Sequence, residues 1–161
     1  MDILGTLRRI DFLTFWSLLG LCFRHPLLPY PTFVATKECL RRSTQHFGRA
    51  HYQNTAANAF RHAYWNYLIA KFCTKWSKNE ETILVWTKAI TDWHENAFKN
   101  RELAKLMDLH NNQIGRTMFK ENSKQSVEKV TVFLLEMTKD AVLIRSKEAL
   151  AQNPTNLVHL V

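Results

Sequence analysis

Three short polar strings hold most of the side chains in this sequence that could take part in chemistry. They occupy residues 59–66, 91–98 and 107–116, and each is embedded in aromatic and aliphatic residues. A polar group buried without a hydrogen-bond partner costs roughly 1–3 kcal/mol, so a cluster of such groups inside apolar sequence needs a reason. A functional site is the commonest reason, and we expect the three strings to build one.

The first string places polar side chains along one line of a predicted helix. Asn58, His62 and Asn66 recur at four-residue intervals, which puts them on the same helical face. Ala59 and Ala63 flank this line, so that a second helix or a ligand can come close. A buried hydrogen-bond network would explain the line equally well, and for His62 alone that explanation is the more common one.

The second string pairs a histidine with an acid near the end of a predicted helix over 80–98. His94 falls on the apolar face of this helix and Glu95 lies at its edge. An inward-facing His beside a carboxylate can act as a general base, a proton shuttle or a metal ligand. The HExxH pattern of zinc proteases is absent, because Phe98 stands where the second His would be.

The third string carries a geometric constraint. Asp108 and His110 would point roughly 160° apart if both were helical. We therefore expect a turn over 102–106 and a helix over 109–121, with Asp108 at or before its first residue, so that both side chains face one cavity. The alternative is an elaborate helix cap in which neighbouring asparagines tie loops together.

A glycine follows in the same string. Gly115 costs about 1 kcal/mol of helix stability relative to alanine, which indicates that another backbone or a ligand approaches closely there.

Together the strings predict one cleft and a hydrolase acting on an ester or phosphoester. His62 or His94 would be the base, while Glu95 and Asp108 would orient it or, with His62, hold a divalent cation. The full candidate catalytic set is His62, His94, Glu95, Asp108 and His110. Asn66, Asn112 and Arg116 are the candidate substrate-binding residues, with Arg116 steadying an anionic group. The sequence lacks a Gly-rich phosphate loop and a GxSxG elbow, which argues against kinases, nucleotide binding and serine hydrolases.

The elements that must position these residues are predicted to be helices. The 161 residues fit one domain, contain few Gly and Pro, and show little β-alternation. We expect an all-α fold, a compact bundle of five or six helices. Residues 1–32 would form an apolar N-terminal helix and a Pro-rich turn, and residues 33–161 the helical domain, with the motif region at 54–120. Its first helix would cover 33–46, and the last would run from about 126 to 151.

The segment over 10–23 is the most apolar part of the chain. It is shorter than the roughly 20 residues needed to cross a bilayer, and no signal-peptide cleavage site follows it. It either covers the core or lies in a membrane interface with its aromatic side chains inserted and Arg8, Arg9 and Arg24 near the headgroups. The membrane-interface alternative goes with a second candidate function. In it the protein is a non-catalytic, membrane-peripheral interaction protein whose polar cluster is structural.

The charge limits the kinds of partner, and the cysteine content indicates the cellular compartment. The formal net charge of +8 suggests an anionic partner, but no stripe of Arg and Lys alternates with aromatics as a nucleic-acid groove requires. We therefore expect a small-molecule or lipid substrate and no nucleic acid. Three widely spaced cysteines indicate reduced thiols in a cytoplasmic protein.

The three strings resemble an uncharacterised bacterial helical domain family. Its pattern is N/D-A-F-R-H-A-x-W-N, then His-Glu, then M-D-L-H-N-N-x-x-G-R, and this chain matches it over about residues 54–120. Members occur as small stand-alone proteins and as terminal domains of larger, toxin-like proteins. The resemblance implies an enzymatic activity without defining the reaction.

Overall fold

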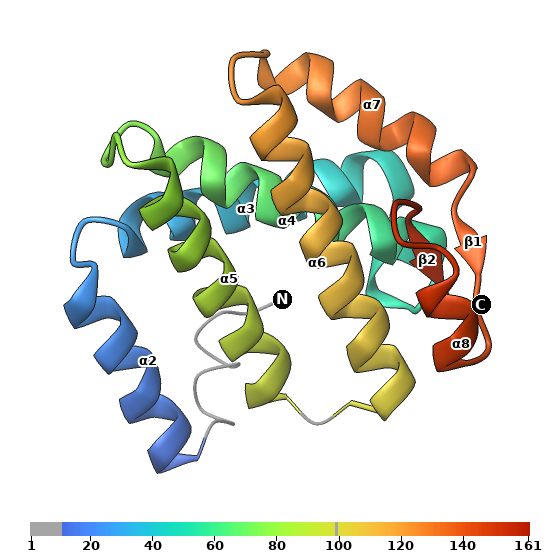
Figure 1. The fold of residues 1–161 in the computed structure, drawn as a ribbon, viewed down its shortest axis with the longest axis horizontal. Helices are drawn as coiled ribbons and strands as arrows, with labels where there is room; N and C mark the ends of the chain where they lie inside the picture. Colours follow the sequence, from blue (N-terminus) through green and yellow to red (C-terminus); the bar gives the residue numbers. More distant parts are fainter. Residues whose placement is uncertain (1–10, 99) are drawn as a thin grey trace.

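The computed structural model describes residues 11–98 and 100–161, which form a single helical domain (Figure 1). The all-α prediction is confirmed, although these residues contain seven α-helices rather than five or six. The helices are α2 (Phe12–Arg24), α3 (Pro29–Phe47), α4 (Ala56–Cys73), α5 (Glu80–Ala97), α6 (Glu102–Asn122), α7 (Val127–Lys139) and α8 (Lys147–Ala151). The remaining elements are a 3-10 turn η1 (Ala50–Tyr52) and two short parallel strands, β1 (Val142–Leu143) and β2 (Val158–His159).

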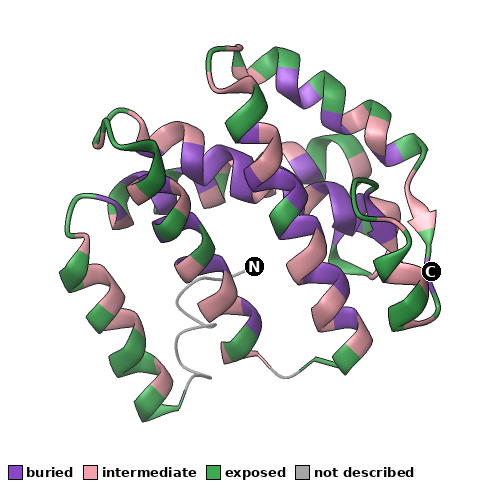
Figure 2. Ribbon diagram, in the orientation of Figure 1, coloured by how far each residue is buried: buried purple, intermediate pink, exposed green. Residues whose placement is uncertain are grey.

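Helix α4 runs through the middle of the bundle. It contacts α3, α5, α6 and α7, and most of its surface is buried on all sides (Figure 2). Aromatic and aliphatic residues such as Phe60, Tyr64 and Leu68 fill the core around it. The polar side chains of α4 are therefore enclosed by protein, and they need partners on the neighbouring helices.

Helices α4 and α6 approach each other closely at Gly115. A Cβ atom built on Gly115 would lie 2.0 Å from the backbone oxygen of Ala63, so only glycine fits there. The close approach expected at Gly115 is confirmed. It sets Asn112, one turn before Gly115, against His62, the residue before Ala63.

Helix α6 starts earlier than the sequence suggested. The expected turn over 102–106 is wrong, because the helix is continuous from Glu102 and includes Asp108. Its first residues are strong helix formers, and Glu102 in the first turn suits the helix dipole. Helix α3 likewise begins at Pro29 rather than at 33, because a proline is well tolerated in the first turn.

The C-terminal part differs most from the prediction of one long helix to about 151. Helix α7 ends at Lys139, and the chain continues as strand β1. Val142 N donates to Leu157 O (2.8 Å) and Ile144 N donates to His159 O (2.8 Å), which pairs β1 with the end of the chain. This long-range pairing overrides the helical periodicity of the sequence.

Helix α2 lies at the edge of the bundle beside α5 (Figure 1). Asp11 caps its first turn by accepting a hydrogen bond from Thr14 N at 3.0 Å. Arg8, Arg9 and Ile10 of the predicted N-terminal segment lie outside the described residues. Among the described helices, none has both the length and the apolar character needed to cross a membrane.

Candidate functional site

Three ionisable side chains from three helices meet in the core between α4, α5 and α6. His62 Nδ1 lies 3.5 Å from Glu95 Oε1, and His62 Nε2 lies 3.3 Å from Asp108 Oδ1. The three residues are 3%, 7% and 5% exposed, so water does not solvate them freely. One ligand atom from each lies within 4.8 Å of the others, which is close enough for a single metal ion to contact all three.

Hydrogen bonds fix the protonation of His62. Arg61 Nη2 lies 2.8 Å from His62 Nε2. A guanidinium group can only donate, so Nε2 accepts and the ring proton sits on Nδ1. Nδ1 then donates to Asn112 Oδ1 at 3.2 Å. Burial, together with the positive charge of Arg61, lowers the pKa of His62 to about 3. His62 is therefore neutral at pH 7, as a metal ligand has to be.

The two carboxyl groups differ in protonation. Burial by itself would raise the pKa of Glu95, but the hydrogen bonds from His94 and Asn112 and the charge interactions with His62 and His94 together outweigh it, and the pKa falls to about 2. Burial and the negative charge of Glu95 raise the pKa of Asp108 to about 8. Asp108 Oδ1 is buried and has no hydrogen-bond partner among the described residues, while Oδ2 accepts from Asn100 Nδ2 at 3.4 Å. Such an unpartnered oxygen beside a carboxylate is costly unless something binds it.

His94 lies between this buried group and the protein surface. Its Nδ1 is 3.3 Å from Glu95 Oε1, so the carboxylate holds the ring proton on Nδ1 and leaves Nε2 as the basic nitrogen. The ring packs edge-on against Trp65 at 5.1 Å between centroids and against Phe98 at 5.0 Å. His62, His94, Glu95 and Asp108 therefore lie side by side, as expected, but of these four only His62 and His94 line a pocket.

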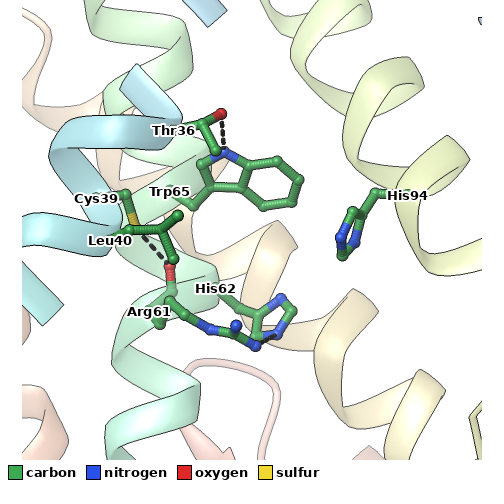
Figure 3. A pocket seen from close by; sticks show the side chains of 7 residues that line it. All are labelled: Thr36, Cys39, Leu40, Arg61, His62, Trp65 and His94. Carbon is green, nitrogen blue, oxygen red and sulfur yellow. Dashed lines mark hydrogen bonds between the residues drawn. The ribbon is translucent and has the colours of Figure 1, made fainter. Parts of the chain in front are cut away.

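A small pocket leads from the surface to the two histidines (Figure 3). Trp65 forms one wall, and its Nε1 donates to Thr36 Oγ1 at 2.8 Å. Cys39 also lines the pocket, but burial raises the pKa of its thiol to about 12, so it is not a nucleophilic thiolate. The lining residues are Thr36, Cys39, Leu40, Arg61, His62, Trp65 and His94.

Two buried asparagines connect the helices behind the site. Asn66 Nδ2 donates to Asn112 Oδ1 at 2.7 Å, and Asn112 Nδ2 donates to Glu95 Oε1 at 3.3 Å. Arg116 Nη1 donates to Asn66 Oδ1 at 2.8 Å, and Nη2 donates to Gln113 Oε1 at 2.8 Å. These residues hold Glu95 and His62 in place. None of the three predicted substrate-binding residues, Asn66, Asn112 and Arg116, is among the residues that line the pocket.

His110 does not join the site. Because α6 is helical through Asp108, His110 points to the opposite side, where its Nε2 donates to Asn156 O at 2.9 Å. Asn111 binds the C-terminal strand: its Nδ2 donates to Val158 O at 2.9 Å, and Val158 N donates to its Oδ1 at 3.0 Å. Residues of the third string therefore have two roles: some belong to the site, and Asn111 anchors β2.

Sequence reasoning missed Arg61 and Trp65. Arg61 is in direct contact with His62 and lines the pocket, but the sequence analysis gave it no role in the site. Neighbouring positions on a helix point about 100° apart, so helical spacing does not indicate that Arg61 and His62 face the same pocket.

Comparison with known proteins identifies a family but no characterised relative. No curated protein and no solved structure matches this sequence. The model of a family described as "Domain of unknown function (DUF6973)" matches residues 19–142. This match begins within α2 and ends in β1, so it is longer than the 54–120 region of the three strings and contains every site residue. The chain therefore belongs to this family of unknown function.

Proposed function

We propose that this protein is a hydrolase of esters or phosphoesters in which His62, Glu95 and Asp108 hold a divalent cation. The observation that carries the proposal is the buried group of three ligand atoms within 4.8 Å of one another. Two carboxyl groups and an imidazole are donors that suit Zn²⁺, Mn²⁺ or Fe²⁺. The rival, a purely structural polar core, does not explain why Asp108 Oδ1 has no partner among the described groups.

Each carboxyl group has an oxygen that accepts no hydrogen bond from the described residues, and at His62 a cation would replace the hydrogen bond from Arg61 to Nε2. Glu95 Oε1 accepts the hydrogen bonds from His94 and Asn112, and no described residue donates to Oε2, which leaves that oxygen for a cation. Asp108 would lose its proton on binding, which metal ligation commonly requires. A cation held here would polarise the scissile carbonyl or phosphoryl group.

The chain's own residues supply the proton transfer. Glu95 holds the Nδ1 proton of His94, so Nε2 of His94 is free to take a proton from a water molecule that enters the pocket. This gives His94 the role of general base. His62 is unsuited to it, because its Nε2 lone pair would be held by the cation and because its pKa is lowered to about 3.

Arg61 takes the role that the sequence assigned to Arg116. It lines the pocket beside His62, whereas Arg116 is turned away onto Asn66. A guanidinium group at this place can bind an anionic oxygen of a substrate through charge-assisted hydrogen bonds. The resemblance of the strings to bacterial proteins with toxin-like members adds support for an enzymatic role.

Hydrolysis assays on the purified protein test this function. We expect p-nitrophenyl acetate or p-nitrophenyl phosphate to be cleaved when Mn²⁺ or Zn²⁺ is added and not in the presence of a chelator. His94→Ala should lower the rate by at least about 100-fold, which is the contribution of a general base. His110→Ala is the matched control and should retain the rate. Equal rates for the His94→Ala variant and the wild type would contradict the assignment, as would rates that metal and chelator leave unchanged.

A further inference from the structure

We infer that α2 docks this protein on an anionic membrane surface. The helix has no buried residue, and its outer face consists of large apolar side chains. Phe12, Leu13 and Phe23 are more than 70% exposed, and Trp16 is 53% exposed. Exposed apolar side chains are ordinary when scattered, but an adjacent group of this size indicates an interaction surface.

Helix α2 is apolar on both of its sides. Leu18, Leu21 and Cys22 face inward and pack against the core. Trp93 of α5 fastens this inner side, because its Nε1 lies 3.1 Å from Thr14 O and 3.0 Å from Ser17 Oγ. The aromatic face therefore points away from the protein, and a helix that is apolar all round is normally covered on every side.

Exposure of apolar side chains continues along the chain beyond α2. The residues that follow form the loop to α3 and its first two turns, and four of them are large, apolar and exposed. These four are Leu27 (57%), Tyr30 (64%), Phe33 (47%) and Val34 (37%). Exposed apolar residues therefore continue along the chain from α2 into the first turns of α3.

The charges of this region identify an anionic bilayer as the partner. Between Phe12 and Lys37 the sequence contains no Asp or Glu, while Arg24 and Lys37 are exposed. Tyr30 packs against Trp76 at 5.7 Å between ring centroids, and the exposed Lys75 is Trp76's neighbour in the chain. Basic residues beside Trp and Phe are typical of helices that lie in the headgroup region, where the cations attract anionic lipids.

Vesicle flotation of the full chain tests this inference. Vesicles of phosphatidylcholine alone are compared with vesicles of equal parts phosphatidylcholine and phosphatidylserine. We expect the protein to float only with the phosphatidylserine vesicles and to be released by high salt. The double variant Trp16→Ser, Phe23→Ser should bind at least about tenfold more weakly, because two interfacial aromatics are lost.

A control lies on α7. Val132 and Phe133 are exposed at 55% and 41%, so Val132→Ser, Phe133→Ser removes exposed apolar side chains away from α2 and should retain vesicle binding. The inference is overturned if the wild type does not float, or if both double variants bind alike. It is also overturned if α2 substitution instead dissociates a dimer in solution, since the covering partner would then be a second copy. The readout is binding, so the result does not depend on the proposed hydrolase.

Discussion

Replacing Gly115 with alanine should destabilise the protein, although alanine is the better helix former. The new Cβ would lie 2.0 Å from Ala63 O, and Cβ contacts below 3.0 Å essentially do not occur. Helices α4 and α6 would have to separate by about 1 Å, because the obstacle is backbone rather than a flexible side chain. Overpacking costs about 1–3 kcal/mol, and the forced backbone movement places this site at the upper end. Subtracting a gain of about 1 kcal/mol for removing a helical glycine leaves a loss of about 2 kcal/mol.

Thermal unfolding measures this loss directly. In a domain of this size, a loss of about 2 kcal/mol lowers Tm by about 4–8 °C. Gly20→Ala is the matched control, because Gly20 lies within α2 and a Cβ there meets nothing within 4 Å. It should raise Tm slightly. A Gly115→Ala variant as stable as the wild type, or more stable, would refute the close contact between α4 and α6.

Two further predictions concern pH and the C-terminal strand. The Asp108 carboxyl has a pKa of about 8 in the folded protein against 3.8 in the unfolded chain, so the folded state binds its proton more tightly and stability is lost as pH rises from about 4 to 8. Asp108→Asn should remove this loss in urea unfolding measured across that range, and an unchanged slope would contradict the raised pKa. Asn111→Ala should lower stability by about 2 kcal/mol in urea unfolding, because it leaves a buried N–H and C=O of Val158 without partners. The metal affinity of the Asn111→Ala variant should equal that of the wild type. A loss of affinity as large as in Asp108→Asn would contradict the conclusion that Asn111 anchors β2 and does not belong to the site.

The sequence predicted which side chains face inward at the site because helical periodicity determines which residues share one face of a helix. Spacing placed His62 and Asn66 on one face of α4, and that prediction required only that the segment be helical. His110 was assigned to the site through an assumed turn before Asp108. Local residues instead favoured one continuous helix, so the same geometric argument excludes His110.

Features that depend on contacts between distant parts of the chain could not be predicted from the sequence. Nothing near Val142 in sequence indicates pairing with β2, and the role of Asn111 depends on that pairing. The contact of Arg61 with His62 depends on how α3, α4 and α5 enclose the pocket. For α2, the sequence left a core helix and a membrane helix as alternatives. In the structure the inner face packs on the core and the outer face is exposed, so the core contact does not exclude membrane docking.

Equilibrium dialysis with metal analysis tests the central claim most directly. We predict about one Mn²⁺ or Zn²⁺ per chain in the wild type, with affinity at least about tenfold weaker in Asp108→Asn and in Glu95→Gln. Asp92→Asn is the control, because Asp92 is a carboxylate on α5 that pairs with Lys88 outside the site. Its affinity should equal that of the wild type. A wild-type protein that binds no divalent metal, or three variants that bind it equally, would contradict the assignment of His62, Glu95 and Asp108 as a metal site.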